Sequence, residues 1–290
     1  MKLKIAGFVV EYDGTFDDYA DRMAKYSYNS TATPDVTIKY RCPEKIELPD
    51  LSDVHDESSW KVGNTPDGGT AAYIAAKKSG RVLTYIENDA EYKNISSAFV
   101  KMPNSGPENL TDADREYVRG ATMFNSFLLS RGGTTLHGSC ISYNGEGVVF
   151  CAPSGMGKST HTALWKTAFG DKVEFVNDDK PAVSEKDGKL FISGTPWSGK
   201  HNISSNITVP LKAVVFLERG KENEIKSVST AETVGFLNAQ TFPPFYDKKL
   251  CMNNFDVIEK IINTVPTYRL FCNMDISAAT VSKNAVFGEK

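Results

Sequence analysis

The sequence predicts an α/β protein in which a core of mixed sheet and helices follows a β-rich α+β N-terminal domain. Two observations carry this prediction. An apolar run at positions 148–151 leads into a glycine-rich loop and then a helical pattern, an order typical of phosphate-binding α/β proteins. Positions 1–110 contain mostly strand-like runs, among them a strict alternation of apolar and polar residues over 36–42.

Composition and charge narrow the class of protein. The 290 residues are 40% hydrophobic and 24% charged, which is typical of a soluble globular chain. With 33 basic against 36 acidic residues, the net charge of −3 argues against a nucleic-acid-binding surface. The five cysteines are widely spaced and include no C-x-x-C, so neither a disulfide framework nor a zinc site is predicted.

The N-terminus and the apolar runs bear on localisation. The first apolar run is interrupted at Glu11, below the length of a signal-peptide core. No stretch reaches the length needed to span a membrane. We therefore expect a cytoplasmic protein with neither membrane nor nucleic-acid partners, and a homo-oligomer is left open.

The N-terminal domain is assigned to residues 1–108. Its predicted elements, in order, are a strand at 3–12, a helix at 16–26, a strand at 36–42, an acidic loop at 44–59, a hairpin at 71–76 and 81–87, and a strand at 92–102. His55 lies in the acidic loop, where a metal site and a solvated charged surface are both open. We expect this domain to recognise a substrate or partner, because edge strands accept extended peptides.

Residues 102–110 hold two prolines, a glycine and two asparagines, and are predicted to link this domain to a second one at 109–290. A helix begins at Thr111, where Asp114 completes an approximate capping box. The later elements, in order, are strands at 135–143 and 147–151, a helix from 158 to Gly170, a strand at 173–176, a hairpin at 182–185 and 190–193, a loop at 194–202, strands at 211–217 and 225–228, helices at 230–240 and 255–262, a strand at 268–271 and a helix at 277–287.

The glycine-rich loop carries the strongest chemical signal. Positions 152–159 read A-P-S-G-M-G-K-S, which matches G-x-x-x-x-G-K-[ST] except that Ala152 replaces the first glycine. Alanine is harmless there if its φ is negative. Lys158 would reach the β- and γ-phosphates, and the Ser159 hydroxyl would bind Mg²⁺; the alternative is a turn before an ordinary surface helix. The predicted nucleotide-binding residues are Pro153, Ser154, Gly155, Met156, Gly157, Lys158, Ser159 and Thr160.

Other polar residues are expected around this loop. Asp178 and Asp179 lie at the end of the next strand after the loop's helix, and ligands bind beyond strand ends in open α/β sheets. One of the two carboxylates could hold Mg²⁺ and the other could accept a proton. The alternative is a surface turn that contains two acidic residues. His137 could contact a phosphoryl oxygen or simply be packed. Lys200, in the loop at 194–202, could contact phosphate. His161 is expected on the surface of its helix.

This order of motifs resembles the HPr kinase/phosphorylase superfamily: Leu136-His137-Gly138, then the glycine-rich loop, then Asp178-Asp179, then a further glycine-rich loop. The resemblance covers about 135–220. It implies a P-loop core related to ATP-dependent phosphoenolpyruvate carboxykinases. It also implies that Lys158 cradles phosphate, that Ser159 binds Mg²⁺, that one aspartate deprotonates the acceptor hydroxyl, and that His137 contacts phosphate.

The resulting hypothesis is an ATP- and Mg²⁺-dependent kinase that acts on a serine-type hydroxyl of a peptide, protein or small metabolite. Catalysis would involve Lys158 and His137, with Asp179 as the first choice for the base and Asp178 on the metal side. Two alternatives are a nucleotide-binding regulatory or scaffold protein without transfer activity, and a carboxykinase-like enzyme.

Overall fold

The computed structural model describes residues 1–101 and 110–288 and divides into two compact units. The first comprises Met1–Arg131 and Pro243–Met252, and the second comprises Gly132–Phe242 and Asn253–Lys290. Residues 102–109 of the predicted linker, and with them the predicted boundary after 108, lie outside the described residues. The helix after this segment clusters with the first unit, whereas the sequence-based division placed it in the second.

Within the described part of the first unit, eight strands form one sheet in the order β1-β2-β3-β8-β7-β6-β5-β4. The strands are β1 (Lys2–Ile5), β2 (Phe8–Asp13), β3 (Val36–Arg41), β4 (Ser52–Glu57), β5 (Trp60–Asn64), β6 (Thr70–Ala75), β7 (Val82–Asn88) and β8 (Asn94–Phe99). Strands β6 and β7 form the predicted antiparallel hairpin.

Two predictions in this unit were wrong in detail. The strand predicted at 3–12 is a hairpin, because Ala6 and Gly7 adopt φ angles of 52° and 87° and turn the chain between β1 and β2. The acidic segment predicted as a loop contains edge strand β4, whose backbone pairs with β5 while its side chains are mostly exposed. His55 lies on this exposed strand, with its Nδ1 3.0 Å from the carbonyl oxygen of Asp53.

Two helices complete the first unit's local structure. The helix predicted at 16–26 is the short α1 (Ala20–Ala24). Helix α2 (Asp112–Ser130) begins at the predicted capping box, in which the Thr111 side chain accepts from the Asp114 N–H and the Asp114 carboxylate accepts from the Thr111 N–H. It packs against β3 and β8.

The second unit is built on a nine-stranded sheet, counted over the described residues, with the path β12-β10-β11-β15-β14-β13-β9 and with β17 joining β15 to β16. The strands are β9 (Thr134–Thr135), β10 (Gly138–Tyr143), β11 (Glu146–Cys151), β12 (Val173–Asn177), β13 (Ala182–Lys186), β14 (Lys189–Ser193), β15 (Thr208–Arg219), β16 (Glu224–Ser227) and β17 (Thr267–Cys272). Strand β11 is parallel to β15 and antiparallel to β10.

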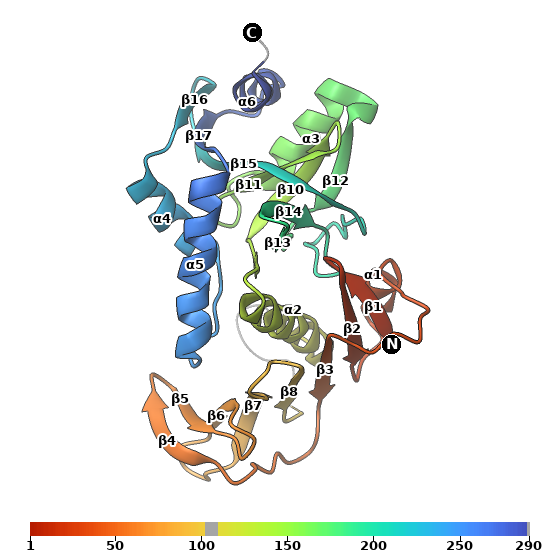
Figure 1. The fold of residues 1–290 in the computed structure, drawn as a ribbon, viewed down its shortest axis with the longest axis vertical. Coiled ribbons are helices and arrows are strands. Elements are labelled where there is room, and N and C mark those ends of the chain that lie inside the picture. The colour runs from red at the N-terminus through yellow and green to blue at the C-terminus, as the bar shows by residue number, and fades with distance from the viewer. Residues whose placement is uncertain (102–109, 289–290) are drawn as a thin grey trace. The chain divides into compact units, whose positions relative to one another are not determined.

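Helices cover both faces of this sheet (Figure 1). They are α3 (Lys158–Phe169), α4 (Thr230–Asn238), α5 (Lys248–Thr264) and α6 (Ser277–Phe287), with a short 3-10 turn, η1 (Gly170–Lys172), after α3. Alternation along β11 explains the two layers, because Phe150 packs with α3 and α6, whereas Val149 packs with α4 and α5. The protein is therefore a mixed α/β protein, as predicted.

Within residues 1–101 and 110–288, none of the helices combines the length and the apolar character that a bilayer crossing needs.

Candidate functional site

The glycine-rich loop, residues 152–157, connects the C-terminal end of β11 to the first residue of α3. Gly155 and Gly157 have φ angles of 77° and 96°, a left-handed conformation that glycine adopts without steric cost. Ala152 is buried, and its φ is not positive, so alanine fits the position that usually holds the motif's first glycine. The two glycines that the conformation requires are thus both present.

Lys158 folds back over this loop from the first turn of α3. Its Nζ donates to the carbonyl oxygens of Ala152 at 2.8 Å and Pro153 at 3.4 Å, and it lies 3.2 Å from Nε2 of His137. The side chain is buried, and this burial lowers the pKa of Lys158, while the nearby Asp179 carboxylate acts in the opposite direction. The ammonium group therefore lies between the loop and His137.

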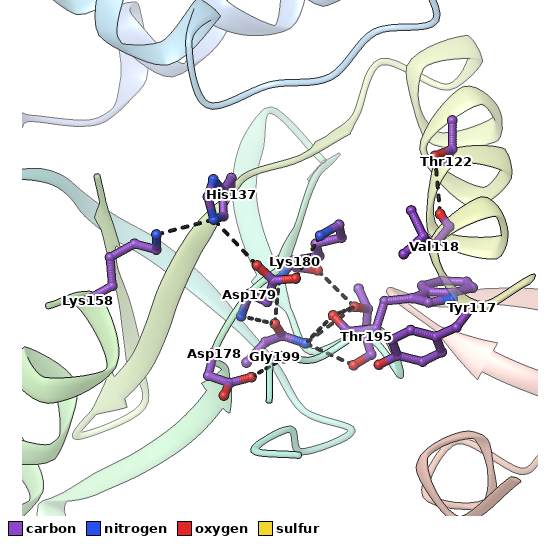
Figure 2. A network of polar contacts seen from close by, with 12 residues as sticks. Tyr117, Val118, Thr122, His137, Lys158, Asp178, Asp179, Lys180, Thr195 and Gly199 are labelled. Atoms are coloured by element: carbon purple, nitrogen blue, oxygen red, sulfur yellow. Dashed lines mark hydrogen bonds and ion pairs between the residues drawn. The ribbon is translucent and has the colours of Figure 1, made fainter. Parts of the chain in front are cut away.

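The position of His137 follows from the strand order. Strand β10 lies between β11 and β12 and is antiparallel to both, with Gly138 opposite Cys151 and Cys140 opposite Asn177. The start of β10 therefore lies at the edge where β11 and β12 end. His137, just before β10, is consequently flanked by Lys158 after β11 and Asp179 after β12 (Figure 2).

His137 is in contact with both charged groups. Burial lowers the pKa of His137, and the Lys158 ammonium lowers it further, so the imidazole is neutral at pH 7. Nε2 then accepts the hydrogen bond from Lys158. The same nitrogen lies 3.5 Å from Oδ1 of Asp179. These two groups form an ion pair only when the imidazole is protonated. Oδ2 of Asp179 pairs with Nζ of Lys180 at 2.6 Å.

The Asp178–Lys180 turn is held by Asn177, a residue that the sequence analysis did not select. Oδ1 of Asn177 accepts from the backbone N–H groups of Asp179 at 2.8 Å and Lys180 at 2.7 Å. Its Nδ2 donates to the carbonyl oxygen of Thr195 at 2.9 Å, and the Thr195 hydroxyl donates to the carbonyl oxygen of Lys180 at 2.8 Å. An asparagine at a strand end before two acids is a turn-forming signal that could have identified it.

Asp178 points to a different partner from Asp179. Its carboxylate accepts the backbone N–H of Gly199 at 2.6 Å (Figure 2). Burial raises the pKa of Asp178, and the adjacent Asp179 charge raises it further, while the Gly199 hydrogen bond opposes both. A Cβ at position 199 would lie 3.1 Å from Oδ2 of Asp178, so glycine lets the loop backbone approach the carboxylate closely.

The remaining predicted residues are placed as follows. Ser159 and Thr160 lie in the first turn of α3, beside Lys158. Lys200 is exposed, and the contact from its loop to the acidic turn is made by the backbone of Gly199. The expectation for His161 was wrong: it is buried, and its Nε2 accepts from the indole N–H of Trp165 at 3.2 Å and lies 3.2 Å from the Ser282 hydroxyl.

The donors available to a metal ion are few. Among residues 1–101 and 110–288, no three His, Cys, Asp or Glu side chains form a preformed metal cluster. Mg²⁺ typically keeps several waters and binds one or two protein oxygens together with substrate phosphates. The Ser159 hydroxyl in the first turn of α3 and the Asp178 carboxylate after β12 are oxygen donors of the kind that such a site uses.

Comparison with known proteins identifies the family. The family model described as "SynChlorMet cassette protein ScmC" matches residues 121–277, which is more than half of the chain. The chain belongs to the ScmC family. No curated protein matches it.

Solved structures add a distant likeness. The chain is similar to the HPr(Ser) kinase/phosphatase from Coxiella burnetii, at 10% sequence identity and a TM-score of 0.33. The similarity covers 53% of this chain and 97% of that one.

Proposed function

We propose that this protein is an ATP- and Mg²⁺-dependent phosphotransferase that phosphorylates a serine-type hydroxyl on a peptide, protein or small metabolite. One observation carries the proposal: the contacts from Lys158 to His137 and from His137 to Asp179, at 3.2 Å and 3.5 Å, connect the glycine-rich loop to the acidic turn. A lysine cation and a carboxylate beside such a loop are groups that phosphoryl transfer uses, and here the imidazole of His137 lies between the two.

The loop and the start of α3 would hold the phosphates. The backbone N–H groups of residues 154–160 and the positive end of the helix dipole attract anions. Lys158, whose ammonium is at present bonded to loop carbonyls, would turn to the β- and γ-phosphates. The neutral His137 would donate from one ring nitrogen to a phosphoryl oxygen.

In the transfer step, the acceptor oxygen forms a bond to the γ-phosphorus as the bond to the β,γ-bridging oxygen breaks. The hydroxyl proton passes to Asp179, and ADP leaves with the bridging oxygen. Asp179 suits the base role because it is the carboxylate nearer to Lys158 and His137. Mg²⁺, when bound, would neutralise charge on the phosphates, and Ser159 and Asp178 would hold it.

Transfer of labelled γ-phosphate from Mg-ATP to a panel of hydroxyl-bearing peptides and small alcohols tests the proposal. We expect Lys158→Ala to lower kcat/KM by about 10² or more, since the lysine stabilises developing phosphate charge. The matched control is Lys166→Ala, on the same helix, whose Nζ donates to the carbonyl oxygen of Val173. Lys166→Ala should retain activity within about twofold.

A Lys158→Ala protein that transfers phosphate as well as wild type would contradict the proposal. A wild-type protein that binds ATP but neither hydrolyses it nor transfers phosphate to any acceptor would instead support a nucleotide-binding regulatory role.

A further inference from the structure

A cavity of about 470 Å³ lies in the second unit, against the glycine-rich loop. It is bounded by the loop, by the exposed side of α3, and by the segments that follow β15 and β17. The side chains that matter to its chemistry are Met156, Thr160, Leu164, Arg219, Cys272 and Met274. Its volume falls within the range of small-molecule sites.

The cavity and the acidic turn lie on different sides of the start of α3. Residues two positions apart on a helix point about 200° apart. Lys158 points toward His137, so Thr160 points away from it and lines the cavity, as does Leu164 one turn later. A triphosphate wrapped by the loop with its terminal phosphate near His137 would therefore direct its other end toward the cavity.

The walls of the cavity suit a flat heteroaromatic ring. Met156, Cys272 and Met274 bring three sulfur atoms to one cavity, and polarisable sulfur makes favourable contacts with aromatic rings. Met274 is 75% exposed, so this large apolar side chain has much surface left to cover. Leu164 adds an aliphatic wall from α3.

Arg219 supplies a polar group next to the loop. Its Nη2 lies 3.4 Å from the carbonyl oxygen of Gly155, which places the guanidinium between the cavity and the phosphate-binding backbone. A guanidinium there can donate to an α-phosphate or ribose oxygen.

We propose that this cavity binds the base and ribose of the nucleoside triphosphate. The inference rests on the proposed function, since it requires that the loop bind the phosphates. It adds that nucleoside affinity comes from Leu164 and Met274, residues separate from the phosphate-binding loop.

The test compares two probes on the full chain: ATP and inorganic tripolyphosphate, each with Mg²⁺, by titration calorimetry. Leu164→Ala combined with Met274→Ala should raise the Kd for ATP about tenfold and leave the Kd for tripolyphosphate unchanged. The matched control is Met252→Ala, a methionine 62% exposed and outside the cavity, which should change neither Kd.

The ratio of the two Kd values separates the possible failures. Damage to the fold would weaken the binding of both probes and leave the ratio unchanged. A cavity that does not contact the nucleoside would also leave the ratio unchanged. The Met274→Ala single variant, at an exposed position, excludes misfolding as the reason. An unchanged ratio in that single variant and in the double variant overturns the inference while the proposed function stands. If wild type binds neither probe, the proposed function fails and the inference fails with it.

Discussion

Asn177 offers the sharpest test of how the acidic turn is held. Asn177→Ala removes the three shortest side-chain hydrogen bonds of a buried residue: two from the backbone N–H groups of Asp179 and Lys180, and one to the carbonyl oxygen of Thr195. At about 1 kcal/mol for each bond, the free energy of unfolding should fall by about 3 kcal/mol. For a chain of this size the melting temperature should fall by roughly 6–12 °C.

Thermal melting followed by circular dichroism, together with urea denaturation, measures this change. The matched control is Asn206→Ala, an exposed asparagine in the same unit, which should stay within about 0.5 kcal/mol of wild type. Transfer activity should also fall in Asn177→Ala, because the turn that carries Asp179 loses its anchor. A variant with the melting temperature and activity of wild type would refute the role assigned to Asn177.

Two further predictions concern buried groups of the second unit. Burial lowers the pKa of His161 to about 4, so as the pH falls from 6.5 to 4.5 only the unfolded chain takes up this proton, and stability is lost. Urea denaturation at pH 7 and pH 4.5 measures the free energy of unfolding that each protein loses between these two pH values. For His161→Gln this loss should be about 2–3 kcal/mol smaller than for wild type, whereas His55→Gln, at an exposed position, should lose as much as wild type. Equal losses in all three proteins would exclude this cause. Gly199→Ala should lower transfer activity about tenfold with little change in melting temperature, because the new Cβ displaces the Asp178 carboxylate, whereas Gly235→Ala, whose Cβ meets nothing within 4 Å, should keep full activity.

The parts of the site that the sequence predicted are those encoded locally. The loop needs two positive φ angles, and glycines stand at both positions. The hairpin that brings His137 to the loop follows from a strong turn, Asn144-Gly145, between two strands of equal length. The capping box at Thr111 was likewise readable, because both partners lie within one helical turn.

The features that the sequence did not predict depend on contacts between segments that are distant in the chain or on strand pairing. The role of Asn177 requires Thr195, which lies 18 residues further along the chain, beyond the hairpin of β13 and β14. His161 looked like a surface residue because its burial is created by Trp165 and by Ser282 on distant α6. Strand β4 shows no alternation of apolar and polar residues, because its backbone pairing with β5, and not side-chain burial, makes it a strand.

The insertion of β10 between β11 and β12 has a chemical consequence. In a sheet of parallel strands only, every strand would present its C-terminal end at the edge that carries the glycine-rich loop, and each polar group there would follow a strand. Because β10 is antiparallel to both neighbours, its N-terminal end lies at that edge and brings His137 between Lys158 and Asp179. The imidazole thus separates the ammonium from the carboxylate, so the two do not form a direct ion pair that would occupy both groups. In the proposed function, this spacing lets Lys158 turn to phosphate without first breaking an ion pair with Asp179, whose own ion pair is with Lys180 at 2.6 Å.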